Sequence, residues 1–207
     1  MAEQSSSLWR APLPLLLAST SSARRRVLEA AAVPVESEAA GIDEREVETQ
    51  SGLTDPVAVA TLLARSKAMA VAARRQNRLV LGADQTLALG DRRFSKPADR
   101  AAAAVQLRAL SGTAHHLHSA ICVVCDGRVA FEHCGTAKLT MRPLSEEMID
   151  AYLTAAGTAA LASVGAYQIE GIGIHLFERI EGDHFTILGL PLLPLLAYLR
   201  RERWVAA

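Results

Sequence analysis

Short apolar runs alternate along the chain with longer segments in which apolar and polar residues are mixed. The runs that predict strands are LPLLLA (13–18), VPVES (33–37), the stretch 78–83, HLHSAICVV (116–124) and RVAFEHCGTAKLTM (128–141). Strands that alternate with helices are typical of an α/β fold. We therefore expect one α/β domain over residues 1–207, because no repeat and no linker-like segment interrupts the pattern.

Capping residues place the helices between these strands. Helices are expected from the STSS cluster to about Ala32, from Pro56 to about Arg75, from Pro97 over 101–110, over 145–157, and from Pro191 to the basic RRER. Thr54, Asp55 and Pro56 form an N-cap and first-turn signature, Ser145 is an N-cap signal for the helix over 145–157, and Ser111-Gly112 is a C-cap signal. The pairs Gly90-Asp91 and Asp126-Gly127 predict hairpin turns. GAYQIEGIGIHLFERIEG (165–182) is expected to form a loop and a strand.

Composition narrows the choice of partners. Lys+Arg and Asp+Glu number 22 each among 207 residues, and 50% of the residues are hydrophobic. This balance argues against a general polyanion-binding surface, so no nucleic-acid partner is expected. The apolar runs 12–19 and 187–199 are too short for a cleaved signal or a membrane span, so we interpret both as buried core of a cytoplasmic protein.

The cysteines and histidines do not predict a zinc site. Cys122 and Cys125 form a C-x-x-C, but on a strand these two positions point to opposite faces. With Cys134 they are interpreted as buried thiols in a reducing compartment. The cluster of His115, His116 and His118 has no full ligand set at a recognised spacing.

LASTSSARRR (17–26) is the first stretch with candidate chemistry. Cations are disfavoured at the positive end of a helix. Arg24, Arg25 and Arg26 fit there if an anion docks on the free N–H groups beside them. The alternative is a solvated basic face in which Arg25 pairs with Glu29, and the stretch alone does not decide between the two. The Walker and dinucleotide-binding glycine motifs are absent.

VLGADQTLALG (80–90) raises a second question, because Asp84 and Gln85 interrupt an apolar strand. A buried carboxylate needs a cation or hydrogen-bond donors. A divalent cation shared with Asp43 or Glu44 would meet that need, whereas the common fates of such residues are an exposed loop for Asp43-Glu44 and a cap for Asp84. Lys67 and Lys96 taken alone would be surface residues.

Together these segments resemble the Maf family of nucleotide pyrophosphatases, also called septum formation inhibitors. The motifs that carry the resemblance are L-A-S-x-S-x-x-R-R at 17–25, Asp43-Glu44, Lys67-Ala68, Gly82-Ala83-Asp84, Lys96-Pro97, L-S-G-x-x-H at 110–115, and G-A-Y through G-L-P-L at 165–192. They occur in the family's order over nearly the whole chain. The resemblance implies a Maf/ITPase-like elongated mixed sheet with flanking helices and two lobes around a central cleft.

The resemblance also implies a reaction and a site. A nucleoside triphosphate would be hydrolysed to a monophosphate and pyrophosphate with a divalent cation, Mg²⁺ or Mn²⁺. Asp84 would accept the proton, and Glu44 and Asp84 would hold the metal. The residues implied to bind the substrate are Ser19, Ser21, Arg24, Arg25, Lys67 and Lys96. A homodimer is suggested by the family alone.

Three positions tune the base in this family, and here they are Ala23, Gln85 and Glu170. Gln85 and Glu170 look closer to the branch that acts on 7-methyl-GTP than to the dTTP/UTP branch, and a carboxylate suits the N1–H and 2-amino edge of guanine. Ala23 stands where the 7-methyl branch has a stacking Trp, and Ser22 stands in place of Pro. The alternative function is a nucleotide-binding regulator of cell division with little turnover. A phosphohydrolase that releases orthophosphate is a third.

Overall fold

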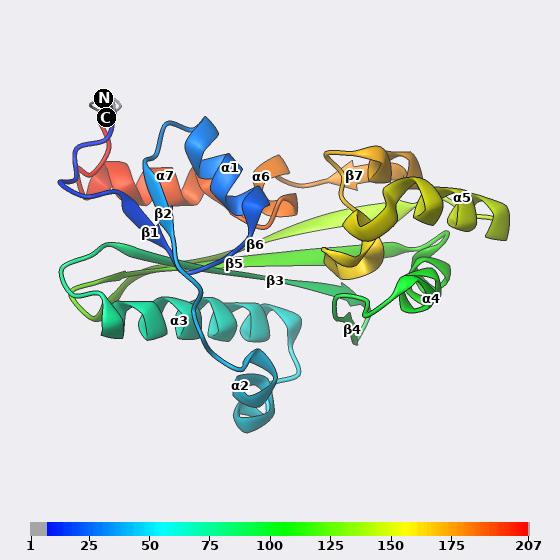
Figure 1. Cartoon of the computed structure of the whole chain (residues 1–207), viewed down its shortest axis with the longest axis horizontal. Helices are drawn as coiled ribbons and strands as arrows, with labels where there is room; N and C mark the ends of the chain where they lie inside the picture. Colours follow the sequence, from blue (N-terminus) through cyan, green and yellow to red (C-terminus); the bar gives the residue numbers. More distant parts are fainter. Residues whose placement is uncertain (1–7, 207) are drawn as a thin grey trace. The chain divides into compact units, whose positions relative to one another are not determined.

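A computed structural model describes residues 8–206 as a mixed α/β protein built on one sheet. The strands are β1 Leu15–Leu17, β2 Val35–Ser37, β3 Val80–Leu89, β4 Arg92–Phe94, β5 Ala114–Cys125, β6 Arg128–Met141 and β7 Phe177–Glu181. Their order is β2-β1-β3-β5-β6-β7, with β4 paired to β3 (Figure 1). β1 runs parallel to β2 and β3, whereas β3–β4 and β6–β7 are antiparallel. The expected fold class is confirmed.

The helices begin largely where capping chemistry predicts. They are α1 Ser22–Ala30, α2 Glu44–Ser51, α3 Pro56–Arg74, α4 Arg100–Leu110, α5 Glu146–Ala156, α6 His184–Ile187 and α7 Leu192–Arg201, with 3₁₀ turns η1 Gly157–Leu161, η2 Val164–Ala166 and η3 Ile172–Leu176. The side chains of Ser21, Asp55 and Ser145 accept N-cap hydrogen bonds from α1, α3 and α5.

The chain divides into two compact units. The first holds residues up to Gln85, Ser119–Gly135 and the chain from Asp183 onward; the second holds Thr86–His118 and Thr136–Gly182. In the first unit α1 and α7 pack on one face of the strands, with Leu28 and Leu195 fully buried (Figure 1). Helix α3 covers the other face through Ala64, Ala68 and Val71.

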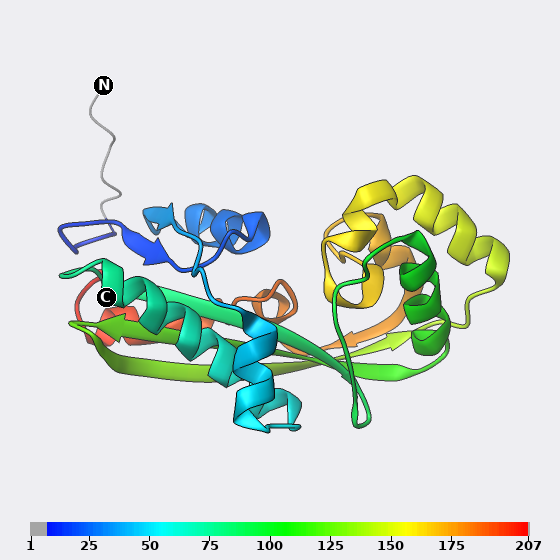
Figure 2. The ribbon, with the colours of Figure 1, turned by 60° about the horizontal axis from the view of Figure 1, so that its bottom comes forward.

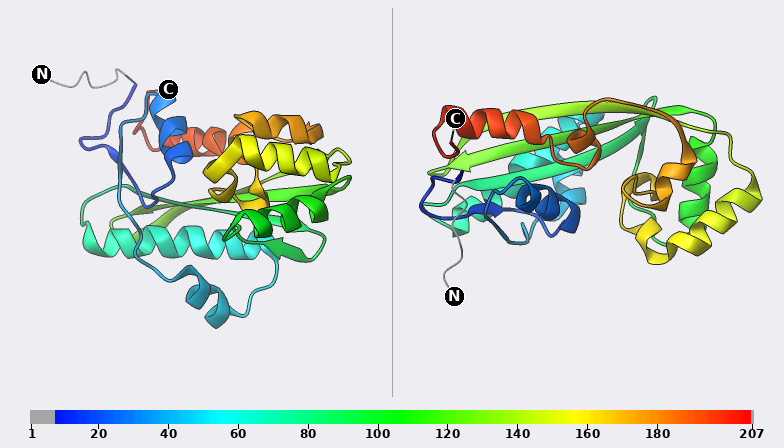
Figure 3. Two further views of the ribbon diagram at one scale, coloured as in Figure 1. Left: turned by 45° about the vertical axis from the view of Figure 1, so that its right-hand side comes forward. Right: turned by 90° about the horizontal axis from the view of Figure 1, so that it is seen from above.

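The second unit contains α4, α5 and the 3₁₀ turns beside β4, β7 and the ends of three long strands. Figures 2 and 3 show α4 and α5 on the same face of these strands. His115 and Tyr167 are buried in this unit, and their Nε2 and hydroxyl atoms lie 2.7 Å apart. Phe177 packs edge-on against the Tyr167 ring.

Helix α3 passes the length and hydropathy criteria for a membrane span, which is weak evidence by itself. Eight of its residues are buried inside the protein, among them Val59, Leu63 and Lys67. A helix that buries one side against a sheet in this way has the features of a core helix.

Four expectations need correction. Pro97 does not open a helix; α4 begins at Arg100 because Asp99 Oδ1 accepts a hydrogen bond from the Ala102 amide at 2.7 Å. β3 continues unbroken to Leu89, because protein groups meet the polar side chains of Asp84 and Gln85. Asp43-Glu44 opens α2 rather than lying in a loop, with Asp43 as N-cap. Of the three thiols only Cys122 is buried; Cys125, the last residue of β5, and Cys134, which packs beside the core of the first unit, are partly exposed.

Candidate active site

A buried lysine lies between two carboxylates in the first unit. Lys67 Nζ is 2.6 Å from Asp84 Oδ1 and 2.9 Å from Glu44 Oε1. Lys67 is 8% exposed and Asp84 7%. Such a buried pair needs close contact to offset the cost of desolvating both charges. Asp84 therefore faces an ammonium group, which is the answer to the question raised by its apolar strand.

Packing of α3 on β3 makes this contact. Successive residues of a strand point to opposite faces, so Gly82 and Asp84 both face α3. A Cβ at Gly82 would stand 2.1 Å from the Ala64 carbonyl oxygen and 2.7 Å from the Ala68 amide nitrogen. Only glycine permits this approach, and it brings Lys67, the residue before Ala68, directly over Asp84.

Arg24 binds the part of the β3 edge that β1 does not pair with. β1 ends at Leu17, so the Ala83 carbonyl has no strand partner on that side; it accepts a hydrogen bond from Arg24 Nη1 at 2.8 Å. Arg24 Nε donates to the Gly189 carbonyl at 2.9 Å, and Nη1 also donates to Ser19 Oγ at 3.3 Å. Burial lowers the pKa of the guanidinium below its ordinary value, and the charges of Asp84 and Glu44 oppose this shift.

The electrostatics of Asp84 suit a proton acceptor. Burial raises its pKa above the ordinary 3.8, and the positive charges of Lys67 and Arg24 only partly offset this effect. A carboxyl with a raised pKa accepts a proton more readily than an exposed one. Its Oδ2 makes no hydrogen bond within residues 8–206, so one oxygen remains available for a water molecule.

The opening motif caps α1 with its serines. Ser21 Oγ accepts from the Arg24 amide at 3.4 Å, and Ser19 Oγ accepts from the Ser21 amide at 3.2 Å. Ala23 is half-buried in the first turn of the helix. Ser19, Ser21 and Arg24 thus lie together at the helix N-terminus, where an anion would meet amide donors.

Arg25 makes a different contact from its neighbour. Its Nε is 2.7 Å from Glu29 Oε1, with both side chains about half exposed. It lines a hollow of about 640 Å³ together with Arg75, Arg78 and the edge strand β2. That hollow contains neither Asp84 nor Lys67, and its other two arginines are paired with Glu38 and Glu36. We do not place the reaction there; the implied role of Arg25 in substrate binding stays a prediction.

Gln85 faces the opposite side of the sheet from Asp84. Its Nε2 donates to Ser119 Oγ at 2.9 Å, to the Ile187 carbonyl at 3.0 Å and to the Thr186 carbonyl at 3.2 Å. Ser119 in turn donates to the Thr186 carbonyl at 2.6 Å. The sequence analysis missed Ser119, which a serine inside an apolar strand could have indicated, and α6, which begins after the N-cap Asp183.

Lys96 and Glu170 belong to the second unit. Lys96 is exposed in the segment between β4 and α4, and Glu170 is exposed between η2 and η3. Their roles toward substrate stay predictions.

Acidic side chains are the candidate ligands for a divalent cation at this site. Within the described residues no group of three or more His, Cys, Asp or Glu side chains is arranged to hold a metal. Glu44 and Asp84 nonetheless converge on one point, the Lys67 ammonium. Mg²⁺ is commonly bound by one or two carboxylates, with phosphate oxygens and waters as the remaining ligands. The pair therefore fits a cation that arrives with a phosphorylated substrate.

The chain is similar to known proteins over nearly its whole length. A model of the family described as Maf-like protein matches residues 14–202. The chain is 57% identical over 199 residues to the nucleoside triphosphate pyrophosphatase of Rhodopseudomonas palustris (strain BisB18), covering 96% of this chain and 98% of that protein. The identity and coverage are the same for the protein of that name from Bradyrhizobium diazoefficiens. The 7-methyl-GTP pyrophosphatase of Rhizobium etli is 56% identical over 188 residues, 90% of this chain and 94% of that protein.

Proposed function

The chain belongs to the Maf family, and from this premise we propose that it hydrolyses a nucleoside triphosphate to the monophosphate and pyrophosphate. The observation that carries the proposal is the buried contact of Asp84 with Lys67, with Glu44 on the same ammonium. A protein that only bound nucleotides would need cations for the phosphates, but it would not need a buried carboxylate with a raised pKa.

The chemistry follows from the charges. Water attacks the α-phosphorus, the bond from that phosphorus to the bridging oxygen breaks, and pyrophosphate leaves with the electron pair. Asp84 orients the water and accepts its proton. Lys67 and Arg24 place positive charge near the buried carboxylate before the reaction starts, so negative charge that develops on phosphate oxygens meets fixed donors.

A divalent cation, Mg²⁺ or Mn²⁺, would be held by Glu44 and Asp84 together with phosphate oxygens. When bound, it neutralises phosphate charge. Lys67 would then be free to direct an N–H at the substrate. The ammonium contacts both carboxylates, so it offsets part of their negative charge by itself.

We propose a purine base with an N–H donor edge. Thr186 and Ile187 present only carbonyl oxygens, so the atom of Gln85 that faces them is the amide nitrogen. Both N–H groups of Gln85 are therefore taken by the protein, and a base can meet only its Oε1, an acceptor. Guanine offers N1–H and the 2-amino group, which also suit Glu170. The relatives with the two names are about equally similar, so neither name selects the 7-methyl form.

A substrate panel tests the proposal. Purified protein with Mg²⁺ or Mn²⁺ is given the common NTPs and dNTPs and 7-methyl-GTP, and phosphate is measured with and without inorganic pyrophosphatase. We expect phosphate only with the coupling enzyme, guanine nucleotides among the best substrates, and a loss of about 10²–10⁴-fold in Asp84→Asn. Orthophosphate without the coupling enzyme would reject cleavage at the α-phosphorus. Nucleotide binding without turnover would favour the regulator.

We further propose that the protein works in the cytoplasm, where its three free thiols stay reduced. Size-exclusion chromatography would test the homodimer that the family suggests.

A further inference from the structure

Glu44 belongs to a helix that does not hold itself in place. Among the described residues α2 buries none, and its sequence EREVETQS offers no apolar stripe. Glu44 is half exposed, and a half-exposed ion pair such as that with Lys67 contributes little stability by itself. Something outside α2 must keep the Glu44 carboxylate within reach of Lys67 and Asp84.

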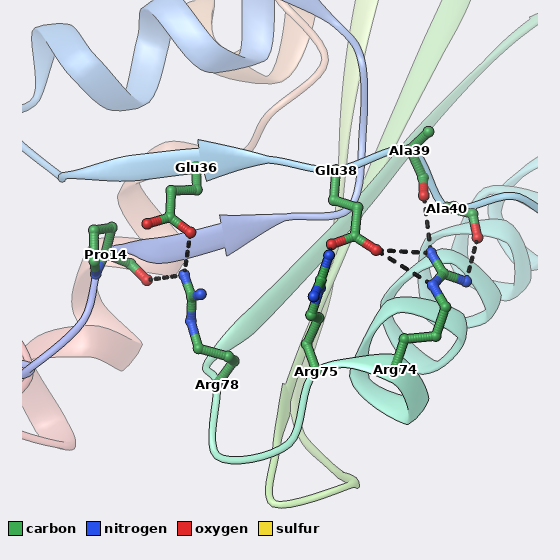
Figure 4. A network of polar contacts seen from close by, with 8 residues as sticks. All are labelled: Pro14, Glu36, Glu38, Ala39, Ala40, Arg74, Arg75 and Arg78. Atoms are coloured by element: carbon green, nitrogen blue, oxygen red, sulfur yellow. Dashed lines mark hydrogen bonds and ion pairs between the residues drawn. The ribbon is translucent and has the colours of Figure 1, made fainter.

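The segment that leads into α2 is held by Arg74, the last residue of α3. Its Nη1 donates to the Ala40 carbonyl at 3.0 Å and its Nη2 to the Ala39 carbonyl at 2.9 Å. Nε and Nη2 both lie 3.2 Å from Glu38 Oε1 (Figure 4). One planar guanidinium thus binds three consecutive residues, two of them through main-chain oxygens. A planar fork of donors is suited to such multiple contacts.

Arg75 offers a natural comparison. Its Nε donates to Glu38 Oε2 at 2.7 Å, which is the other oxygen of the same carboxylate (Figure 4). It makes no hydrogen bond to the carbonyls of residues 39 and 40 within the described chain. Arg75 therefore shares the charge interaction of Arg74 but not its hold on the main chain.

Only three residues separate this contact from Glu44. Gly41 lies against Arg74, since a Cβ there would be 3.9 Å from Nη1, and it adopts a positive φ of 68°. Ile42 packs on the core between α3 and the sheet. Asp43 Oδ1 then caps α2 by accepting from the Glu46 amide at 3.1 Å. Each intervening residue is itself constrained, so the position set at Ala40 is passed on to Glu44.

We propose that Arg74 is a positioning residue for the metal and phosphate site, acting through the main chain of residues 38–40 on Glu44. It links the far end of α3 to the helix that carries Glu44, so that α3 supplies both Lys67 and the anchor of the residue opposite it. Loss of the anchor should let α2 move and weaken the hold of Glu44 on a cation, while Asp84 and Lys67 keep their contact.

The test compares Arg74→Gln with Arg75→Gln, and Glu44→Gln serves as the reference for complete loss of the carboxylate. The kinetic part of this test rests on the proposed pyrophosphatase activity. We expect Arg74→Gln to raise the Mg²⁺ concentration for half-maximal rate about tenfold, the lower end of the effect of residues that support metal ligands. The nucleotide KM at saturating Mg²⁺ should change little, and Arg75→Gln should follow the wild-type Mg²⁺ curve.

A second readout needs neither metal nor activity. Hydrogen exchange of the metal-free protein should show lost protection of the α2 amides, residues 44–51, in Arg74→Gln but not in Arg75→Gln. If Arg74→Gln does not fold, Arg74→Lys replaces it, because a single ammonium cannot bridge both carbonyls. Wild-type exchange of α2 in the Arg74 variant, or equal Mg²⁺ curves for the two arginine variants, would overturn the proposal. An inactive wild-type protein would reject the pyrophosphatase function and leave the exchange result to decide the role of Arg74.

Discussion

Replacing Gly82 by alanine should inactivate the protein through packing, without touching a charged group. The added Cβ would stand 2.1 Å from the Ala64 carbonyl oxygen, which is 1.3 Å short of the 3.4 Å at which ordinary contact begins. It would also meet the Ala68 amide at 2.7 Å. Both obstacles are main-chain atoms of α3, so no side-chain rotation removes them and the helix must move away from β3.

Lys67 lies between Ala64 and Ala68 on α3, so a movement of this helix also displaces Lys67. Lys67 Nζ is 2.6 Å from Asp84 Oδ1, and a displacement of about 1 Å would take the pair to about 3.6 Å, beyond hydrogen-bond distance. Misplacement of this size can cost about a hundredfold in rate. The forced overpacking should also lower the free energy of unfolding by about 1–3 kcal/mol.

The assay is kcat for the best nucleotide, measured beside thermal unfolding. Leu107→Ala in α4 is the control for stability, since truncating this buried Leu of the second unit costs about 2–5 kcal/mol, whereas Lys67 and Asp84 belong to the first unit. Adding Ala68→Gly to Gly82→Ala removes the 2.9 Å contact with the Ala68 Cβ but leaves the Ala64 carbonyl in place, so activity should not return. Full activity in Gly82→Ala, or recovery in the double variant, would refute the reasoning.

Two pH effects follow from buried groups. Burial raises the pKa of Asp84 above 3.8, so the base gains its proton early as pH falls; the acid limb of kcat/KM should lie above pH 3.8, and a limb at or below that value would contradict the assignment. Burial, with the charge of His116, lowers the pKa of His115 to about 4 from 6.5. The unfolded chain therefore takes up this proton first, and the free energy of unfolding should fall by about 3 kcal/mol between pH 6.5 and 4. Urea unfolding at both pH values should show a smaller fall in His115→Gln, and an equal fall would contradict the assignment.

Turns and helix caps, which depend on residues close together in the sequence, could be predicted from the sequence. The Asp126-Gly127 turn has positive φ at both residues, 49° and 73°, as the dipeptide indicates for a tight hairpin. Asp55 and Ser145 cap helices where their side chains can reach an amide three residues on. Helix α2 escaped notice because it buries nothing, and a polar stretch without an apolar stripe leaves no periodic signal.

The partner of Asp84 could not be predicted in the same way. Lys67 lies 17 residues earlier on a different element, and the contact depends on how closely α3 approaches β3. A glycine inside a strand, such as Gly82, indicates that another backbone approaches closely. The sequence does not show which helix residues lie opposite it. The buried carboxylate predicted a cation, and the structure supplies an ammonium group at the position where the two carboxylates converge.

The two adjacent arginines show why one motif can hold two roles. Neighbouring residues on a helix point about 100° apart, and Arg24 and Arg25 make different contacts. Arg24 is held by three protein acceptors because β1 stops at Leu17 and leaves the edge of β3 open. Arg25 is paired with Glu29 on the surface, and breaking this pair costs about 0–1 kcal/mol. A bound triphosphate could therefore recruit Arg25 at little cost, whereas moving Arg24 would leave the Ala83 and Gly189 carbonyls without a donor. We therefore predict that Arg24 organises the site and that Arg25 is the arginine that a bound triphosphate recruits.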